Sequence, residues 1–204
     1  MRIYFRPFAG SLAARIACLE GELDAEFVLV EQGMALPDGR DLRDVSPLGY
    51  VPALETPAGF RLSETPAVLS YIAELAPEGV LAPVPFSDAH YRMLAWLALI
   101  SSELHKGVFD PLMRKTAAEA ERATARWRAA RPFALLSRHL EAADHLEGGF
   151  SVADAYLLTV LNWCEHAGLS LEPWPVLRAW RHRLRARPSV ARAMAEEYPL
   201  LRAA

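Results

Sequence analysis

The sequence predicts a small α/β domain followed by an all-helical domain. Within roughly the first 80 residues short strand patterns alternate with helix patterns, whereas from Asp88 onward the apolar residues follow helical periodicity alone. A proline-rich stretch between the two regions, residues 77–87, is typical of a linker. We therefore expect domains at residues 1–76 and 88–204, and a chain of 204 residues is long enough for both to have a core.

The N-terminal region begins with a strand, a helix and a second strand. Arg2-Ile3-Tyr4-Phe5 predicts a short strand that ends before Pro7. Ser11 introduces a helical pattern that ends near Gly21. The continuous apolar run at residues 27–30 is typical of a strand buried on both faces.

A loop, a hairpin and a helix complete this region. Residues 32–43 are polar and rich in Gly, Pro and charge, which predicts a loop or a weak helix. Short strands at 53–56 and 60–62 flank Pro57-Ala58-Gly59, as in a β-hairpin. A helix is expected at about 65–75, and its inward residues would be Val68, Leu69, Ile72 and Leu75. This order of elements predicts one mixed sheet with helices packed on it.

The second region has helical patterns and no strand pattern. Breaks are expected at Gly148-Gly149, at Pro173-Trp174-Pro175 and at Pro188. The helical patterns run through about residues 88–115, 118–145, 152–166, 174–186 and 189–196. We therefore expect a helical bundle.

Composition and charge exclude several classes of function. A net charge of −3 gives no general attraction to phosphates, so no nucleic-acid partner is expected. The longest apolar-rich segment, residues 152–163, is shorter than the ~20 residues of a membrane span, so no membrane partner is expected. No N-terminal apolar run fits a signal peptide, and Cys18 and Cys164 lie far apart, which favours a cytoplasmic protein. The six histidines lack metal-ligand spacing and predict no metal.

Ser11 is the first candidate for chemistry, because it lies where a strand gives way to a helix. A serine at this position commonly caps its own helix. It could instead donate a hydrogen bond to a bound thiolate and lower that thiol's pKa from about 8.5, helped by the partial positive charge of the helix start. Both interpretations stay open.

Two other segments predict a binding cradle for a small peptide. Val51-Pro52 directly precedes a strand, and a cis bond there would turn the Val51 backbone outward to pair with an extended ligand. Glu64 and Thr65 begin a helix, where Glu64 could hold an ammonium and Thr65 a carboxylate. The alternatives are an ordinary turn proline and an acidic residue that favours the helix dipole.

Two further segments lie on expected helices. Ser151 and Asp154 have the spacing of a capping box, so their expected role is structural. His105 lies on the first long helix of the second region. Its side chain either faces the cleft between the domains or is hydrogen-bonded within the helical domain.

Together these segments resemble the cytosolic glutathione transferases, and most closely the bacterial beta class. The resemblance covers nearly the whole chain, and its carriers are Ser11-Leu12-Ala13 and residues 49–54, 64–67, 103–107 and 150–156. It implies a thioredoxin-like N-terminal domain with a mixed four-stranded sheet, a C-terminal helical bundle with a second-substrate pocket, and a homodimer. It also implies glutathione, as a substrate, bound at Val51-Pro52 and held by Glu64 and Thr65 at its γ-glutamyl end.

The chain departs from the beta-class pattern near the expected thiol. Gly10 stands where beta-class members typically carry a cysteine, so a mixed disulfide with glutathione is unavailable at that position. Phe5 stands where family members often carry a tyrosine, and Ala98 where an asparagine is often found. No basic residue is evident around residues 32–36. We expect Phe5, Gly10 and His105 to line the cleft or to lie directly behind the residues that line it.

The function that the resemblance implies is conjugation of glutathione to a small hydrophobic electrophile. Ser11 would stabilise the glutathione thiolate, and His105 would border the thiol or the second substrate. Two alternatives stay open: a binding or scaffold protein that keeps this fold without turnover, and a glutathione-dependent isomerase. The long helices carry apolar residues compatible with a homodimer interface, such as Tyr91, Leu94 and Trp96.

Overall fold

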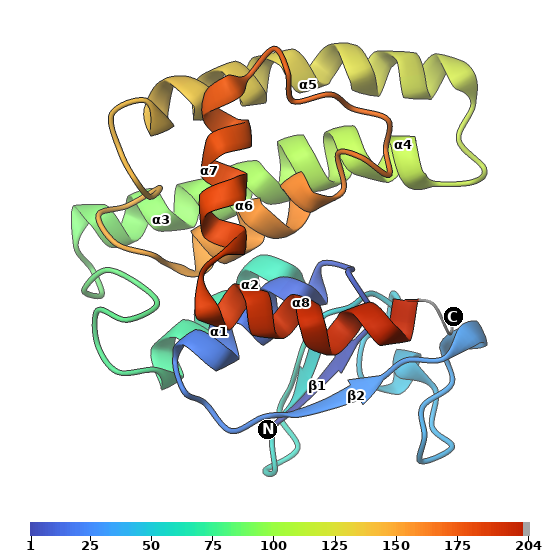
Figure 1. Cartoon of the computed structure of the whole chain (residues 1–204). Helices are drawn as coiled ribbons and strands as arrows, with labels where there is room; N and C mark the ends of the chain where they lie inside the picture. Colours follow the sequence, from blue (N-terminus) through green and yellow to red (C-terminus); the bar gives the residue numbers. More distant parts are fainter. Residues whose placement is uncertain (202–204) are drawn as a thin grey trace.

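In the computed structural model, which describes residues 1–201, a helical domain is stacked on a sheet domain (Figure 1). The sheet domain contains β1 (Arg2–Phe5), α1 (Ser11–Glu20), β2 (Glu26–Leu29), β3 (Ala53–Glu55), β4 (Arg61–Leu62) and α2 (Thr65–Leu75). The helical domain contains α3 (Asp88–Leu99), the π-helical segment η3 (Ile100–Phe109), α4 (Asp110–Met113), α5 (Glu119–Leu140), α6 (Val152–Asn162), α7 (Pro175–Arg185) and α8 (Pro188–Leu201). The predicted fold class is therefore confirmed.

Within the described residues the sheet has four strands in the order β2-β1-β3-β4. β1 pairs in parallel with β2 and antiparallel with β3, and β3 and β4 form the expected hairpin. The prediction that the second strand is buried on both faces is wrong. β2 begins one residue early, at Glu26, and its remaining residues are only half-buried, because it lies at the edge of the sheet and has one neighbour.

The two faces of the sheet have separate apolar cores. On one face α1 and α2 pack together, with Leu12, Ile16, Val68, Leu69 and Ile72 fully buried. Leu75, expected to point inward, is 48% exposed, because it is the last residue of α2. On the other face the loop after β2 folds back over the sheet, and its apolar cluster is Tyr4, Val30, Leu36, Leu42, Val45 and Ala53.

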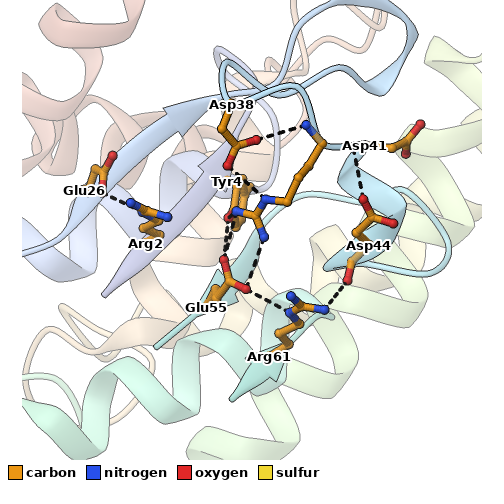
Figure 2. A network of polar contacts seen from close by, with 9 residues as sticks. Arg2, Tyr4, Glu26, Asp38, Asp41, Asp44, Glu55 and Arg61 are labelled. Atoms are coloured by element: carbon orange, nitrogen blue, oxygen red, sulfur yellow. Dashed lines mark hydrogen bonds and ion pairs between the residues drawn. The ribbon is translucent and has the colours of Figure 1, made fainter. Parts of the chain in front are cut away.

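A network of polar contacts fixes this loop to the sheet (Figure 2). Arg40 Nη2 donates to Glu55 Oε2 on β3 (3.1 Å) and to Tyr4 Oη on β1 (2.7 Å), and Tyr4 Oη donates to the same carboxylate (2.8 Å). Arg61 on β4 donates to Glu55 Oε1 (2.9 Å) and to the backbone carbonyl of Asp44 (2.7 Å). These bonds hold the pKa of the Glu55 carboxyl at about 2. The loop that leads to residues 49–52 is therefore held firmly in place.

Several helix boundaries differ from those expected. The pattern at 88–115 spans α3, η3 and α4, with a change from α-helical to π-helical hydrogen bonding at Ile100. The patterns at 118–145 and 152–166 end early, at Leu140 and Asn162, because apolar periodicity continues into turns that pack on the core. α8 runs to Leu201, beyond the expected residue 196, because it packs along α1.

One continuous core joins the two domains. α1 contacts α6 and α8, and a single cluster of buried residues extends from α1 and α2 through α6 to α5 and α7. Figure 1 shows α8 returning from the helical domain to lie beside α1. This return contact carries the C-terminal helix to the start of α1, where the functional site lies. Among the helices of residues 1–201, none has the length and apolar character needed to cross a membrane.

Candidate functional site

A cavity of about 530 Å³ lies between the two domains, at the end of the sheet where α1 and α2 begin. Its sheet-domain lining comes from the loop before α1, residues 6–10, and from Gly49–Pro52, Glu64 and Thr65. Its helical-domain lining is Ser101, His105, Lys106, Asp110, Met113, Tyr156, Asn162, Trp163, His166 and Leu201. The structure thus brings Gly10, Val51, Pro52, Glu64, Thr65 and His105 together, all of which were predicted from the sequence.

Val51 and Pro52 form one wall of the cavity. The Val51-Pro52 bond is cis, as the sequence suggested. β3 begins at Ala53, so the Val51 peptide precedes the hydrogen-bonded ladder and stands beside the cavity. An extended ligand can add to the sheet at this point through backbone hydrogen bonds.

Glu64 and Thr65 form the end of the cavity at the start of α2. Glu64 is the N-cap residue of α2, but its side chain makes no capping hydrogen bond, so the carboxylate remains available to a ligand. Its backbone lies at φ 72°, a left-handed conformation that a residue with a side chain rarely adopts. Thr65 is buried as the first residue of α2. Helix N–H groups and a carboxylate suit a ligand that carries both an anion and an ammonium.

Gly10 lies close to residues from both domains that line the cavity. A β-carbon built on Gly10 would lie 3.2 Å from Thr65 Oγ1, 3.4 Å from His105 Cε1 and 3.6 Å from the Val51 carbonyl oxygen. Gly10 is also the N-cap residue of α1. The Leu12 and Ala13 N–H groups bond to the Ala9 and Gly10 carbonyls at 3.0 and 3.2 Å, so the N–H groups of Gly10 and Ser11 are the ones at this helix start that could bind a ligand. A side chain at Gly10 would crowd Thr65 and His105, so glycine keeps the backbone here open to the cavity.

Both interpretations of His105 hold, because it lines the cavity and is also hydrogen-bonded within the helical domain. Its Nδ1 lies 2.6 Å from Tyr156 Oη, and its ring packs edge-on against Trp163 with centroids 4.8 Å apart. Burial, and to a lesser degree the charge of Lys106, lower the pKa of His105 to about 4. Burial raises the pKa of Tyr156 to about 12. At neutral pH the imidazole is therefore neutral, and the protonated Tyr156 hydroxyl can donate to Nδ1, which leaves Nε2–H as a donor.

The Ser11 hydroxyl bonds to the loop before α1 and not to the N–H groups of its own helix. Ser11 is the first residue of α1 and fully buried, and among the described residues it is not part of the cavity lining. Its Oγ donates to the Arg6 carbonyl (3.2 Å) and accepts from the Arg6 N–H (3.3 Å), so it does not cap its own helix. These bonds close the turn between β1 and α1. The catalytic assignment of Ser11 stays a prediction, and this geometry favours a structural role.

Phe5 also lies away from the cavity. It is buried on β1, edge-on to Phe27 at 6.1 Å between centroids. The guanidinium of Arg15 lies over both rings, 4.5 Å from the Phe5 centroid and 3.9 Å from that of Phe27. Phe5 thus packs between β1 and the Arg15 side chain of α1.

Two cationic side chains that were not predicted from the sequence also line the cavity. Arg6 lies at the end of β1 and extends toward the loop after β2, where Nη2 is 3.3 Å from Met34 Sδ. Lys106 follows His105, and its Nζ lies 4.2 Å from the centre of the Tyr50 ring across the cleft. Arg6 could have been assigned to the site from its position at the carboxyl end of β1, because ligands bind at that edge in sheets of this kind.

The remaining lining is mainly apolar. Phe8, Met113 and Trp163 contribute apolar surface to the lining, and the Trp163 ring packs against His105. The expected capping box is confirmed: Asp154 Oδ2 accepts from the Ser151 N–H at 3.0 Å and from its hydroxyl at 2.9 Å. Within residues 1–201 no group of three or more His, Cys, Asp or Glu side chains is arranged to hold a metal ion.

Comparisons with known proteins agree with this geometry. The family model described as "Glutathione S-transferase, N-terminal domain" matches residues 9–75, and "Glutathione S-transferase, C-terminal domain" matches residues 89–188. The chain is similar to Glutathione S-transferase GstA of Escherichia coli O157:H7, with 36% identity over 200 residues that cover 97% of this chain and 98% of that protein.

Solved structures show the same similarity along the whole chain. A sphingomonad glutathione S-transferase complexed with glutathione superposes with a TM-score of 0.91 at 37% identity, covering 97% of this chain and 98% of that one. The bacterial beta class glutathione S-transferase of Sphingomonas chungbukensis superposes with a TM-score of 0.90 at 35% identity, with the same two coverages.

Proposed function

The chain belongs to the glutathione S-transferase family and is a glutathione transferase, and from this premise we propose how it binds glutathione and what reaction it performs. The observation that carries the proposal is the convergence of Val51, Glu64, Thr65, Gly10 and His105 on one cavity between the domains. The reaction is conjugation of the glutathione thiolate to a small hydrophobic electrophile.

Glutathione lies along the sheet-domain side of the cavity. Glu64 accepts hydrogen bonds from the γ-glutamyl ammonium, and Thr65 with the start of α2 binds the neighbouring carboxylate. The Val51 backbone, held in place by Pro52, pairs with the central peptide. Arg6 and Lys106, which also line the cavity, supply positive charge for the glycine carboxylate. Arg6 thereby compensates for the missing basic residue around residues 32–36.

The thiol lies beside Gly10. The N–H groups of Gly10 and Ser11 and the Nε2–H of His105 stabilise the thiolate, so the thiol loses its proton to solvent at a lower pH than the usual 8.5 or so. The sulfur lone pair then forms a bond to the electrophilic carbon, whose leaving group departs with its electron pair. The apolar surface of Phe8, Met113 and Trp163 holds the electrophile beside the sulfur, so that the enzyme supplies proximity.

Several properties of the assembly are proposals of the same kind. Residues 1–76 form the glutathione-binding unit, 77–87 the linker, and 88–204 the unit that carries the second-substrate pocket. We propose a homodimer, supported by exposed Tyr91 and half-buried Leu94 and Trp96 on α3. We also propose a cytoplasmic location, supported by Cys18 and Cys164, which are buried free thiols.

Calorimetric titration of glutathione into the purified protein tests the proposal. We expect a Kd between micromolar and low millimolar, which corresponds to about 4–8 kcal/mol. Glu64→Gln should weaken binding by roughly 10- to 100-fold, because it removes a charge-assisted hydrogen bond worth about 1.5–3 kcal/mol. No heat at several millimolar glutathione, and no thermal stabilisation, would instead support the scaffold alternative.

A further inference from the structure

The loop between β1 and α1 contains a residue in an unusual backbone conformation. Phe8 has φ 56°, in the left-handed region that favours glycine. It lies two residues before Gly10, the N-cap residue of α1, and its side chain lines the cavity. A phenylalanine keeps this conformation only where neighbouring groups hold it there.

The C-terminal helix holds the Phe8 peptide through a buried carboxylate. The Phe8 N–H donates to Glu197 Oε2 on α8 at 2.7 Å, and Glu197 is fully buried. Its other oxygen, Oε1, accepts from Arg15 Nε on α1 at 2.9 Å. Glu197 therefore joins the loop before α1 to the helix itself, although 189 residues separate it from Phe8 in the sequence.

A second bond from the helical domain holds the other polar group of Phe8. Trp163 Nε1–H, from the turn that follows α6, donates to the Phe8 carbonyl at 2.7 Å. Both backbone groups of the left-handed residue are thus fixed by side chains of the helical domain. The direction in which the Gly10 and Ser11 N–H groups point depends on this loop, because these two residues follow it directly.

We propose that Glu197 is a positioning residue for the reaction: by holding Phe8 in its left-handed conformation, it aims the start of α1 at the glutathione thiol. This inference rests on the transferase function proposed above and assigns a role in it to the C-terminal helix. Glu197 touches neither the thiol nor the cradle, because it is not among the residues that line the cavity. It acts through Phe8 on the thiolate and leaves the γ-glutamyl end of the site unchanged.

The neighbouring residue provides a matched control. Glu196 also pairs with Arg15, with Oε2 3.0 Å from Nη1, but its side chain is 38% exposed and makes no bond to Phe8. Glu196→Gln therefore removes a carboxylate partner of Arg15 without touching the loop. Glu197→Gln keeps the shape of the side chain, but its one oxygen can replace only one of the two carboxylate oxygens, which accept from Phe8 N–H and Arg15 Nε–H. The charged Arg15 is the stronger donor, so the bond to Phe8 is the one that is lost.

The decisive measurement is the pKa of enzyme-bound glutathione, followed by thiolate ultraviolet absorbance between about pH 5 and 9. All the charged and titratable groups of residues 1–201 that line the cavity remain in these variants: Arg6, Tyr50, Glu64, His105, Lys106, Asp110, Tyr156 and His166. In Glu197→Gln we expect the bound thiol's pKa to rise by about one unit, with roughly tenfold lower turnover below that pKa. The Kd of glutathione, measured at a pH at which the bound thiol is protonated, should change less than about threefold, because the binding residues Val51, Glu64 and Thr65 are unchanged. Glu196→Gln should leave the pKa unchanged.

A double-mutant cycle separates positioning from a merely structural role. Glycine adopts a left-handed conformation at little cost, so Phe8→Gly makes the bond from Glu197 unnecessary for that conformation. Glu197→Gln should then raise the thiol pKa much less in the Phe8→Gly background than in the wild type. If Glu197→Gln does not fold, Trp163→Phe removes the bond to the Phe8 carbonyl and should shift the pKa in the same direction.

Three results would overturn the proposal. They are an unchanged thiol pKa in folded Glu197→Gln, an equal shift in Glu196→Gln, and an equal effect of Glu197→Gln in both Phe8 backgrounds. Failure of the transferase function itself looks different, because the wild-type protein would then bind no glutathione.

Discussion

Replacement of Ser11 by alanine separates the two roles that remain for this residue. In the structure the Ser11 hydroxyl makes two hydrogen bonds to the Arg6 backbone, at 3.2 and 3.3 Å, and is fully buried. Ser11→Ala removes both bonds and leaves the Arg6 N–H and carbonyl with one fewer partner each. From this geometry we expect a loss of stability and little change in chemistry.

The magnitudes of the two effects are well separated. Loss of the buried bonds costs about 1–2 kcal/mol of unfolding free energy, which lowers the Tm of a chain of this size by roughly 3–6 °C. If Ser11 instead donated to the thiolate, its removal would cost about 1.5–3 kcal/mol of thiolate stabilisation and raise the bound thiol's pKa by about 1–2 units. Turnover limited by the thiolate would then fall by roughly 10- to 100-fold.

Thermal unfolding and the pH dependence of glutathione conjugation measure both quantities on the same variant. The structural role predicts a lower Tm, an unchanged thiol pKa and turnover within about threefold of the wild type. Thr65→Val is the matched control, because Thr65 Oγ1 lines the cavity and its loss should weaken glutathione binding. A pKa increase of a full unit in Ser11→Ala would refute the structural role and establish the hydroxyl as a thiolate donor.

Three further predictions follow from the site and its supports. Gly10→Cys should gain a mixed disulfide with oxidised glutathione, visible as a mass increase that Gly10→Ala lacks, because the new thiol would lie beside Thr65 and His105. The folded protein lowers the pKa of His105 from 6.5 to about 4, so the folded state is favoured fully above pH 6.5, and this contribution of up to about 3 kcal/mol is lost as the pH falls toward 4. In urea titrations, His105→Gln should make the unfolding free energy depend less on pH between about 4 and 6.5. An equally steep dependence in the variant would contradict the assignment. Glu55→Gln should lower the unfolding free energy by about 2 kcal/mol at pH 7, because it weakens the bonds from Arg40 and Tyr4; an unchanged urea midpoint would show that the network in Figure 2 contributes nothing to stability.

Most of the fold could be predicted because its patterns are local. The first strand, the hairpin and the helix at Thr65–Leu75 each follow from periodicity and turn residues over a few positions. The edge position of β2 was not predictable in this way. A continuous apolar run fits both a central strand and an edge strand, and the order of strands in the sheet depends on which segments pair.

The candidate site was predicted in part for the same reason. The Val51-Pro52 step and Glu64-Thr65 lie at ends of elements, so their backbone geometry follows from the local sequence. Arg6, Lys106 and Tyr156 were not assigned to the site, because a charged or aromatic residue on an element carries no local sign of which cavity it faces. For Ser11, the sequence indicated the helix start but not the direction of its hydroxyl.

The sequence by itself determined which segments become strands and helices, the division into a sheet region and a helical region, and the placing of ligand-binding residues at helix starts. These features depend on interactions within about a dozen residues. Only the tertiary structure decided that the Ser11 hydroxyl bonds to Arg6, that the Phe5 ring packs against Arg15, and that Glu197 accepts a hydrogen bond from Phe8. Such contacts join residues far apart in the chain, and their geometry is set by how the packed elements meet, so local periodicity carries no trace of them.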